Sequence, residues 1–93
     1  MATVAMFAQS VAVSGTVIDA DSKEPLIGVS ILEVGTTNGM ITDLDGNFQI
    51  SIAAGTTLQL SYVGYETQEI KVGKMHNLGV IELQPEAVGL EDV

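Results

Sequence analysis

The chain has 93 residues, enough for one domain with a small hydrophobic core. Twelve acidic residues face three basic ones, and this net charge of −9 disfavours nucleic acids and anionic membrane surfaces as partners. With no cysteine and one histidine, the chain lacks the ligands of a zinc site and the residues of a Cys–His dyad, and without tryptophan it lacks the best platform for stacking sugars or bases.

Residues 1–9, MATVAMFAQ, are almost all small or apolar and differ from the rest of the chain. They are typical of the end of a secretory signal peptide, so we expect a signal-peptide remnant or a disordered tail here. The alternative for this stretch is a first β-strand. It is too short to cross a bilayer, which takes about 20 apolar residues, and we expect no direct membrane insertion.

Two strands are predicted in the first third of the chain. From Val11 to Ala20, alternate valines share one face, and Gly15 marks a bulge or a close backbone approach. A polar turn that ends in Pro25 follows. The second predicted strand runs from Ile27 to Val34. Its inward-facing residues would be Ile27, Val29 and Ile31.

The middle of the chain predicts a β-hairpin. Ile41 and Thr42 lead into a turn with the Asp45–Gly46 signal, and residues 48–52 lead out with strict alternation. We expect the Asp43 carboxylate to fold back onto the amides of this turn. An Asn–Gly pair at residues 38–39 predicts another turn just before it.

Three further strands are predicted in the last third. Residues 57–63 alternate cleanly, and residues 65–72 form a more polar strand whose charges are typical of a sheet edge. Residues 78–83 form the last strand, and residues 84–93 form an acidic linker. Seven short strands at regular intervals, with no helical period, predict an all-β fold, a seven-stranded antiparallel β-sandwich. The predicted core consists of Val17, Val29, Ile31, Phe48, Ile50, Leu58, Leu60, Ile70 and Ile81.

Three motifs in order resemble a known family. Pro25–Ile31 matches a PLxGVxV segment, Thr42–Phe48 a TDxxGxF signature, and Tyr62–Thr67 a YVGY step of carboxypeptidase-regulatory-like domains. The resemblance covers about residues 11–83 and implies the transthyretin-like (prealbumin-like, Ig-like) form of the sandwich. In the sub-group that these motifs resemble, the domain forms the N-terminal extension of SusC-like TonB-dependent outer-membrane receptors. The implied organisation is a domain over residues 10–84 and a linker over 85–93 that leads toward a TonB box.

The resemblance implies a non-enzymatic periplasmic accessory domain of a nutrient-uptake receptor, with a structural or protein-interaction role at the periplasmic face of the outer membrane. Its partners would be the plug and barrel of the full-length receptor and periplasmic TonB-type coupling proteins. The run Leu90–Val93 is similar to the segment that leads into the TonB box, so we expect the chain to be an excised domain or a truncated product. Two alternatives stay open: a secreted adhesive or carbohydrate-binding module that calcium would stabilise, and the regulatory domain of a metallocarboxypeptidase.

Few residues are candidates for a site. We expect no catalytic residue and no cofactor, and we read the lone histidine, His76, as a surface loop residue. Asp43 and Asp45 carry part of a calcium-loop spacing, but Ile41 and Ile52 stand where that loop needs acids. Asp19 and Asp21 would add ligands only if their loop lies beside this turn. The candidate interaction residues are Tyr62 and Tyr65, whose alternative role is packing at a sheet corner with the Tyr65 hydroxyl in water.

Overall fold

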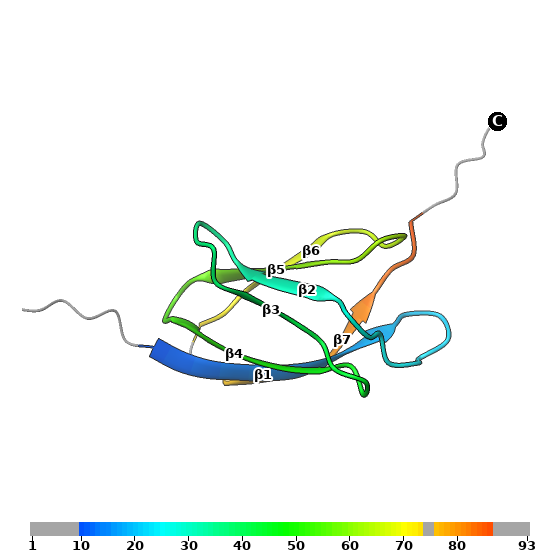
Figure 1. Ribbon diagram of the computed structural model, residues 1–93, viewed down its shortest axis with the longest axis horizontal. Helices are drawn as coiled ribbons and strands as arrows, with labels where there is room; N and C mark the ends of the chain where they lie inside the picture. Colours follow the sequence, from blue (N-terminus) through cyan, green and yellow to red (C-terminus); the bar gives the residue numbers. More distant parts are fainter. Residues whose placement is uncertain (1–9, 74–75, 87–93) are drawn as a thin grey trace, which may run out of the picture.

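The computed structural model describes residues 10–73 and 76–86 of the chain. These residues form seven β-strands (Figure 1). The strands are β1 (Ser10–Asp19), β2 (Ser30–Glu33), β3 (Gly39–Ile41), β4 (Asn47–Ala53), β5 (Thr57–Ser61), β6 (Gln68–Lys71) and β7 (Asn77–Leu83). Within the described ranges there is no helix of the length and apolar character needed to cross a membrane. The signal-peptide prediction for residues 1–9 and the similarity at Leu90–Val93 lie outside the described residues.

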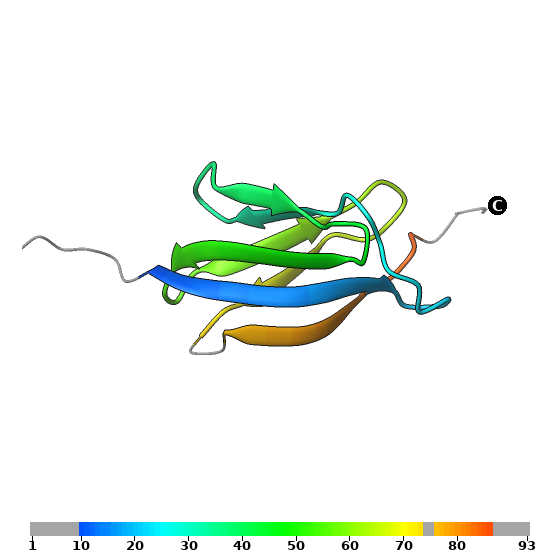
Figure 2. The same ribbon diagram turned by 60° about the horizontal axis from the view of Figure 1, so that its bottom comes forward.

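The strands build two packed sheets. One sheet has three strands in the order β4-β1-β7, and the other has four in the order β3-β2-β5-β6. Figure 2 shows the two layers, with β1 between β4 and β7 in the nearer sheet. The all-β sandwich predicted from the sequence is confirmed. The strand pairs are antiparallel except β1 with β7, which run parallel, an arrangement that alternation within one strand does not encode.

The hydrophobic core lies between the sheets and follows the alternation of the strands. Residues of β4 read exposed, buried, exposed, buried, because every second side chain points inward. The predicted core residues are all buried except Ile70, which is half-buried because β6 lies at the edge of its sheet. The buried hydrophobic residues are Val13, Val17, Val29, Ile31, Phe48, Ile50, Ile52, Leu58, Leu60, Val72, Ile81 and Leu83.

The predicted hairpin around Asp45–Gly46 is wrong in its pairing. The turn forms, because the Gly46 amide donates to the Asp43 carbonyl at 2.9 Å. However, β3 pairs with β2 in one sheet and β4 pairs with β1 in the other, so the turn carries the chain between layers. An Asp–Gly signal specifies a reversal of the chain and leaves the partner of each strand open. Gly46 itself is required there, since its φ is +77° and an added Cβ would lie 2.6 Å from the Val17 carbonyl oxygen.

The second strand is shorter than predicted. β2 begins at Ser30, because Gly28 adopts a φ of +83° in a turn that precedes it. Ile27 is therefore 50% exposed, whereas Val29 and Ile31 are buried as predicted. The bulge predicted at Gly15 is confirmed by a register shift against β7, and the Phe48 ring approaches within 2.9 Å of where a Cβ would stand.

Candidate functional site

The chain leaves the sandwich through a clamp, which we define as residues 64–66 together with residues 84–86. After β7 ends at Leu83, the chain runs antiparallel to the turn that follows β5. The Glu66 amide donates to the Gln84 carbonyl and the Glu86 amide to the Gly64 carbonyl, each at 2.9 Å. Tyr65 and Pro85 pair between these two bonds. This exit clamp holds the described part of the predicted linker, Pro85 and Glu86, against the fold.

The clamp is joined to the end of β1 through one side-chain hydrogen bond. The Tyr65 hydroxyl donates to Oδ2 of Asp19. The other oxygen of Asp19 accepts the amides of Asp21 at 2.7 Å and Ser22 at 2.9 Å. The bond from Tyr65, helped by that from Ser22, lowers the pKa of Asp19, and the same bond together with burial raises the pKa of Tyr65 to about 12. The Tyr65 hydroxyl is thus hydrogen-bonded to Asp19. The alternative role given for Tyr65, packing with its hydroxyl in water, is wrong about the hydroxyl.

The two candidate interaction residues lie next to each other. The ring centroids of Tyr62 and Tyr65 are 5.6 Å apart, in a tilted arrangement. Both rings are half-buried and pack against the core. Their shared turn has Gly64 at a φ of +88°, which explains the YVGY spacing. A partner role for these tyrosines stays a prediction.

Near the C-terminal end of β4, side chains from the segment that follows β2 and from β2 itself are hydrogen-bonded to the outer edge of the strand. The carboxylate of Glu33 accepts the Ala53 amide at 3.0 Å and the Asn38 side-chain amide at 3.0 Å. Asn38 also donates to the Ser51 carbonyl at 2.7 Å. Glu33 is only 6% exposed, and these bonds, that from Asn38 first, lower its pKa. Sequence analysis missed this cluster, because an acid at an inward position of a short strand looks like an error in the alternation.

At the other end of β4, Asp43 performs the role predicted for its turn. Its Oδ1 accepts the amides of Asp45 and Asn47, both at 2.9 Å. In residues 10–73 and 76–86, no group of three or more acids or histidines is placed to hold a metal ion. Asp19 and Asp21 therefore do not join Asp43 and Asp45 in such a group. His76 lies before β7, and its carbonyl accepts the Ser14 amide at 2.8 Å.

The outer edge of β6 differs from that of β4, because no side chain of the described residues is bonded to it. β6 is the last strand of its sheet in the described part of the chain. The Val72 amide donates to Thr56 at 2.9 Å, so the alternation of an antiparallel pair directs the amides of Glu69 and Lys71 away from β5. The prediction of a polar edge strand here is confirmed, although the strand covers only Gln68–Lys71.

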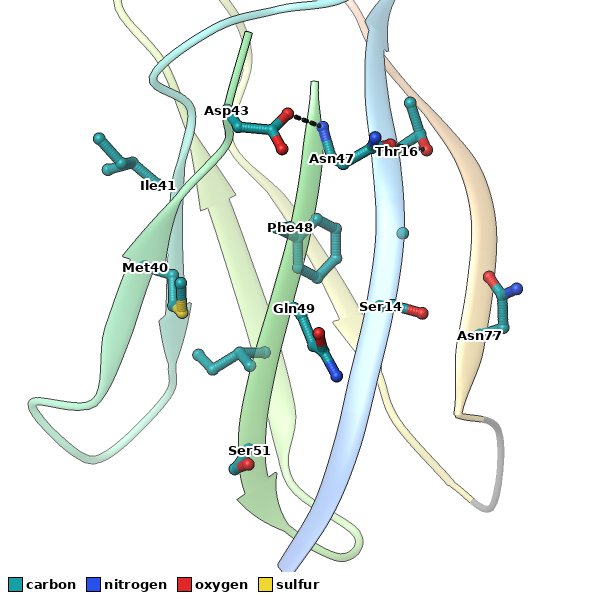
Figure 3. A pocket seen from close by; sticks show the side chains of 12 residues that line it. Ser14, Thr16, Met40, Ile41, Asp43, Asn47, Phe48, Gln49, Ser51 and Asn77 are labelled. Atoms are coloured by element: carbon teal, nitrogen blue, oxygen red, sulfur yellow. Dashed lines mark hydrogen bonds between the residues drawn. The ribbon is translucent and has the colours of Figure 1, made fainter. Parts of the chain in front are cut away.

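A surface groove of about 760 Å³ runs along β4 between β3 and β1 (Figure 3). Its apolar lining comes from Met40 and Ile41 of β3 and from Phe48 and Ile50 of β4. The remainder is mostly uncharged polar surface. The uncharged polar residues of the lining are Ser14, Thr16, Asn47, Gln49, Ser51 and Asn77. Thr16 donates to the Asn47 side-chain oxygen at 2.6 Å, and Asp43 is the charged residue of the lining. Among the described residues that line the groove, no hydroxyl group is hydrogen-bonded to a carboxylate or to a histidine.

Several relatives of this chain are TonB-dependent receptors. The chain is 44% identical to TonB-dependent receptor SusC of Bacteroides thetaiotaomicron over 72 residues, 77% of the chain and 7% of that protein. It is 41% identical to TonB-dependent receptor P3 of Formosa agariphila over 87 residues, 92% of the chain and 9% of that protein. The chain thus spans less than a tenth of the length of these relatives.

Solved structures share the fold. A type II cohesin–X-dockerin complex of Acetivibrio cellulolyticus aligns with a TM-score of 0.61 at 29% identity, over 75% of this chain and 52% of that one. A 9R-lipoxygenase of Cyanothece aligns with a TM-score of 0.53 at 18% identity, over 88% of this chain and 18% of that one, which shows the fold alone. The model of the CarboxypepD_reg-like domain matches residues 13–93. The chain therefore belongs to the CarboxypepD_reg-like domain family, in a form found in SusC-like TonB-dependent receptors.

Proposed function

We propose that this chain is a non-enzymatic accessory domain of a TonB-dependent receptor, exported and lying at the periplasmic face of the outer membrane. The observation that carries the proposal is the 44% identity to TonB-dependent receptor SusC across 77% of the chain. A family of regulatory-like domains, together with a groove in whose described lining no hydroxyl group is hydrogen-bonded to a carboxylate or to a histidine, supports a role in structure or interaction.

The fold suggests what such a domain does for the receptor. The exit clamp fixes the direction in which the chain leaves the sandwich, because Gln84 and Glu86 are both bonded to the turn at residues 64–66. A segment that follows Glu86 would thereby start from a defined point. The domain would orient the receptor segment that engages the energy-coupling machinery.

The proposed partner surface is the β6 edge. The outward amides and carbonyls of Glu69 and Lys71 can accept one more strand, as in β-augmentation. The β4 edge is less suited, since Glu33, Asn38 and Asp43 already bond to its outward groups. The partner would be a periplasmic TonB-type coupling protein that contributes an extended strand.

A titration of the isotopically labelled chain with the periplasmic domain of a TonB-type protein tests this proposal. The largest amide shifts are expected at Thr67, Glu69 and Lys71. Glu69→Pro removes an outward amide without touching a bond to β5, and it should abolish these shifts. Gln49→Pro is the matched control, because it removes an outward amide from β4 and should leave binding unchanged. Absence of any shift in the unmodified chain would refute the partner, and unchanged binding by Glu69→Pro would refute the edge.

A further inference from the structure

The last strand has an unusual mechanical setting. In the described part of the chain, β7 is bonded to a single strand, β1, and the two run parallel from Ser14 and Asn77 to Asp19 and Leu83. The described chain begins at one end of this pair and ends at the other (Figures 1 and 2). A pull on both chain ends therefore slides β7 lengthwise along β1.

Lengthwise sliding strains many bonds at once. In a parallel pair the hydrogen bonds are evenly spaced along the strands, so they share a load directed along the strand axis. When two neighbouring strands are pulled apart from the same end, the bonds break one after another. Buried side chains add to the resistance against lengthwise sliding. Ile81 and Leu83 are 5% and 0% exposed, and both must leave the core together when β7 slides.

The end of β7 is fastened on both sides as well. The Ala20 amide donates to the Leu83 carbonyl at 3.0 Å, and the Lys23 ammonium pairs with Glu82 at 2.9 Å. Beyond Leu83, the exit clamp adds its two backbone bonds, and Tyr65 ties the clamp to Asp19 at the end of β1. The residues nearest the C-terminal exit are therefore bonded both to the first strand and to the opposite sheet.

We infer that the domain is a load-bearing anchor for the segment that follows Glu86. A pull on that segment loads the exit clamp first and then the β1–β7 pair, which it meets in shear. This inference deepens the proposed function, because a segment that couples a receptor to an energy source is one that experiences pulling. It concerns the strength of the domain and needs no particular partner.

Single-molecule pulling on the full chain tests the inference by changing only the direction of force. In the first geometry the handles are attached to the two chain ends. In the second, the N-terminal handle moves to a cysteine introduced as Asp21→Cys, and the other handle stays at the C-terminus. This cysteine is unique, because the unmodified chain has none. Asp21 is exposed beside the end of β1 that lies next to the end of β7, so this pull peels the strands apart. The unfolding force at one loading rate should be at least about twofold higher in the first geometry, because forced unfolding reports the barrier along the pulled direction.

The control is equilibrium unfolding in denaturant, which should be the same for both proteins because neither geometry changes the core. If Asp21→Cys fails to fold, Glu24→Cys provides the same geometry from the same exposed turn. Tyr65→Phe, which keeps the ring and loses the bond to Asp19, should lower the end-to-end force while leaving it above the peeling force. Equal forces in the two geometries would overturn the anchor.

Failure of this inference is distinguishable from failure of the proposed function. The pulling measurement uses the chain alone, whereas the titration uses a coupling protein. A strong end-to-end resistance with no amide shift would keep the anchor and remove the β6 partner. Amide shifts together with equal forces in both geometries would keep the β6 partner and remove the anchor.

Discussion

Two strand edges of this sandwich, those of β4 and β6, meet the solvent in different ways. Along β4, side chains of Glu33 and Asn38 bond to outward groups near one end, and Asp43 bonds to them near the other. Along β6, the outward groups of Glu69 and Lys71 have no such side chains across from them in the described residues. Natural proteins cover strand edges that must not pair, so the difference separates a protected edge from an available one.

The comparison also explains part of the acidic charge. Glu33 and Asp43 are acceptors for backbone amides, so their charges stabilise the β4 side of the fold. Glu69, in contrast, is exposed on the strand that we propose as the partner surface. A net charge of −9 therefore contains structural acids as well as solvated ones.

The largest expected effect comes from the turn that leads into β4. Gly46→Ala should lower the free energy of unfolding by about 2–5 kcal/mol, since it combines a positive φ with an overlap of the new Cβ and the Val17 carbonyl. Gly64→Ala, in the turn before β6, is the matched control. Its φ is also positive, but no other atom lies within 4 Å of where the new Cβ would stand. The loss in free energy of unfolding should therefore be about 1–2 kcal/mol. Urea unfolding of both variants checks the difference, and equal losses would contradict it.

Removing the charge that covers β4 should come next. Glu33→Gln should cost about 1–3 kcal/mol, because a side-chain amide presents a donor to amides that need an acceptor. Glu69→Gln makes the same change on β6 and should stay within about 0.5 kcal/mol. Denaturant midpoints of the two variants measure the contrast. A larger loss for Glu69→Gln would show that the roles of the two edges have been interchanged.

A smaller effect is expected at high pH, where the Tyr65 hydroxyl of the exit clamp loses its proton. The pKa of Tyr65 is raised from 10.0 to about 12, so the folded protein keeps this proton more tightly than the unfolded chain. The associated stability is fully present below pH 10 and is lost as the pH rises from 10 to about 12. Thermal unfolding across this range should show the decline in the unmodified protein and a weaker one in Tyr65→Phe. An identical decline in both would assign it to other groups.

The smallest expected effect concerns the ion pair at the end of β7. The side chains of Lys23 and Glu82 are 58% and 45% exposed, so Lys23→Ala should lower stability by at most about 1 kcal/mol. The loss should shrink further in concentrated salt, which screens exposed charges. Unfolding at low and high ionic strength provides the measurement, and a loss that is large and independent of salt would contradict this assignment.

The core and the layers of the fold were predictable, because alternation in one strand is a local signal. Phe48 and Ile50 face inward for the reason that their spacing indicates, and the motifs at residues 25–31 and 42–48 identified the family. The pairing of strands was less accessible, since the turn at Asp45–Gly46 has the same sequence whether its strands share a sheet or separate. Likewise, the parallel pair of β1 and β7 depends on contacts between residues more than sixty positions apart.

The candidate site was predictable only in part. The tyrosines were singled out from their spacing around Gly64, but the bond from Tyr65 to Asp19 joins residues 46 positions apart. The bonds that Glu33 and Asn38 make to β4 were not predicted, because they join residues of the two different sheets. A buried acid within an apolar strand, followed five residues later by Asn, is the signal that could have been pursued.

The pairing of β1 with β7 also has a consequence for the order of folding. β1 completes its hydrogen bonds only when residue 83 is available, so the three-stranded sheet cannot close on a nascent chain that ends earlier. Contacts of such long separation slow folding, because a large loop must close before they form. A chain of this topology would stay unfolded during synthesis for longer than one built from neighbouring strands, which would suit the export that we propose for this domain.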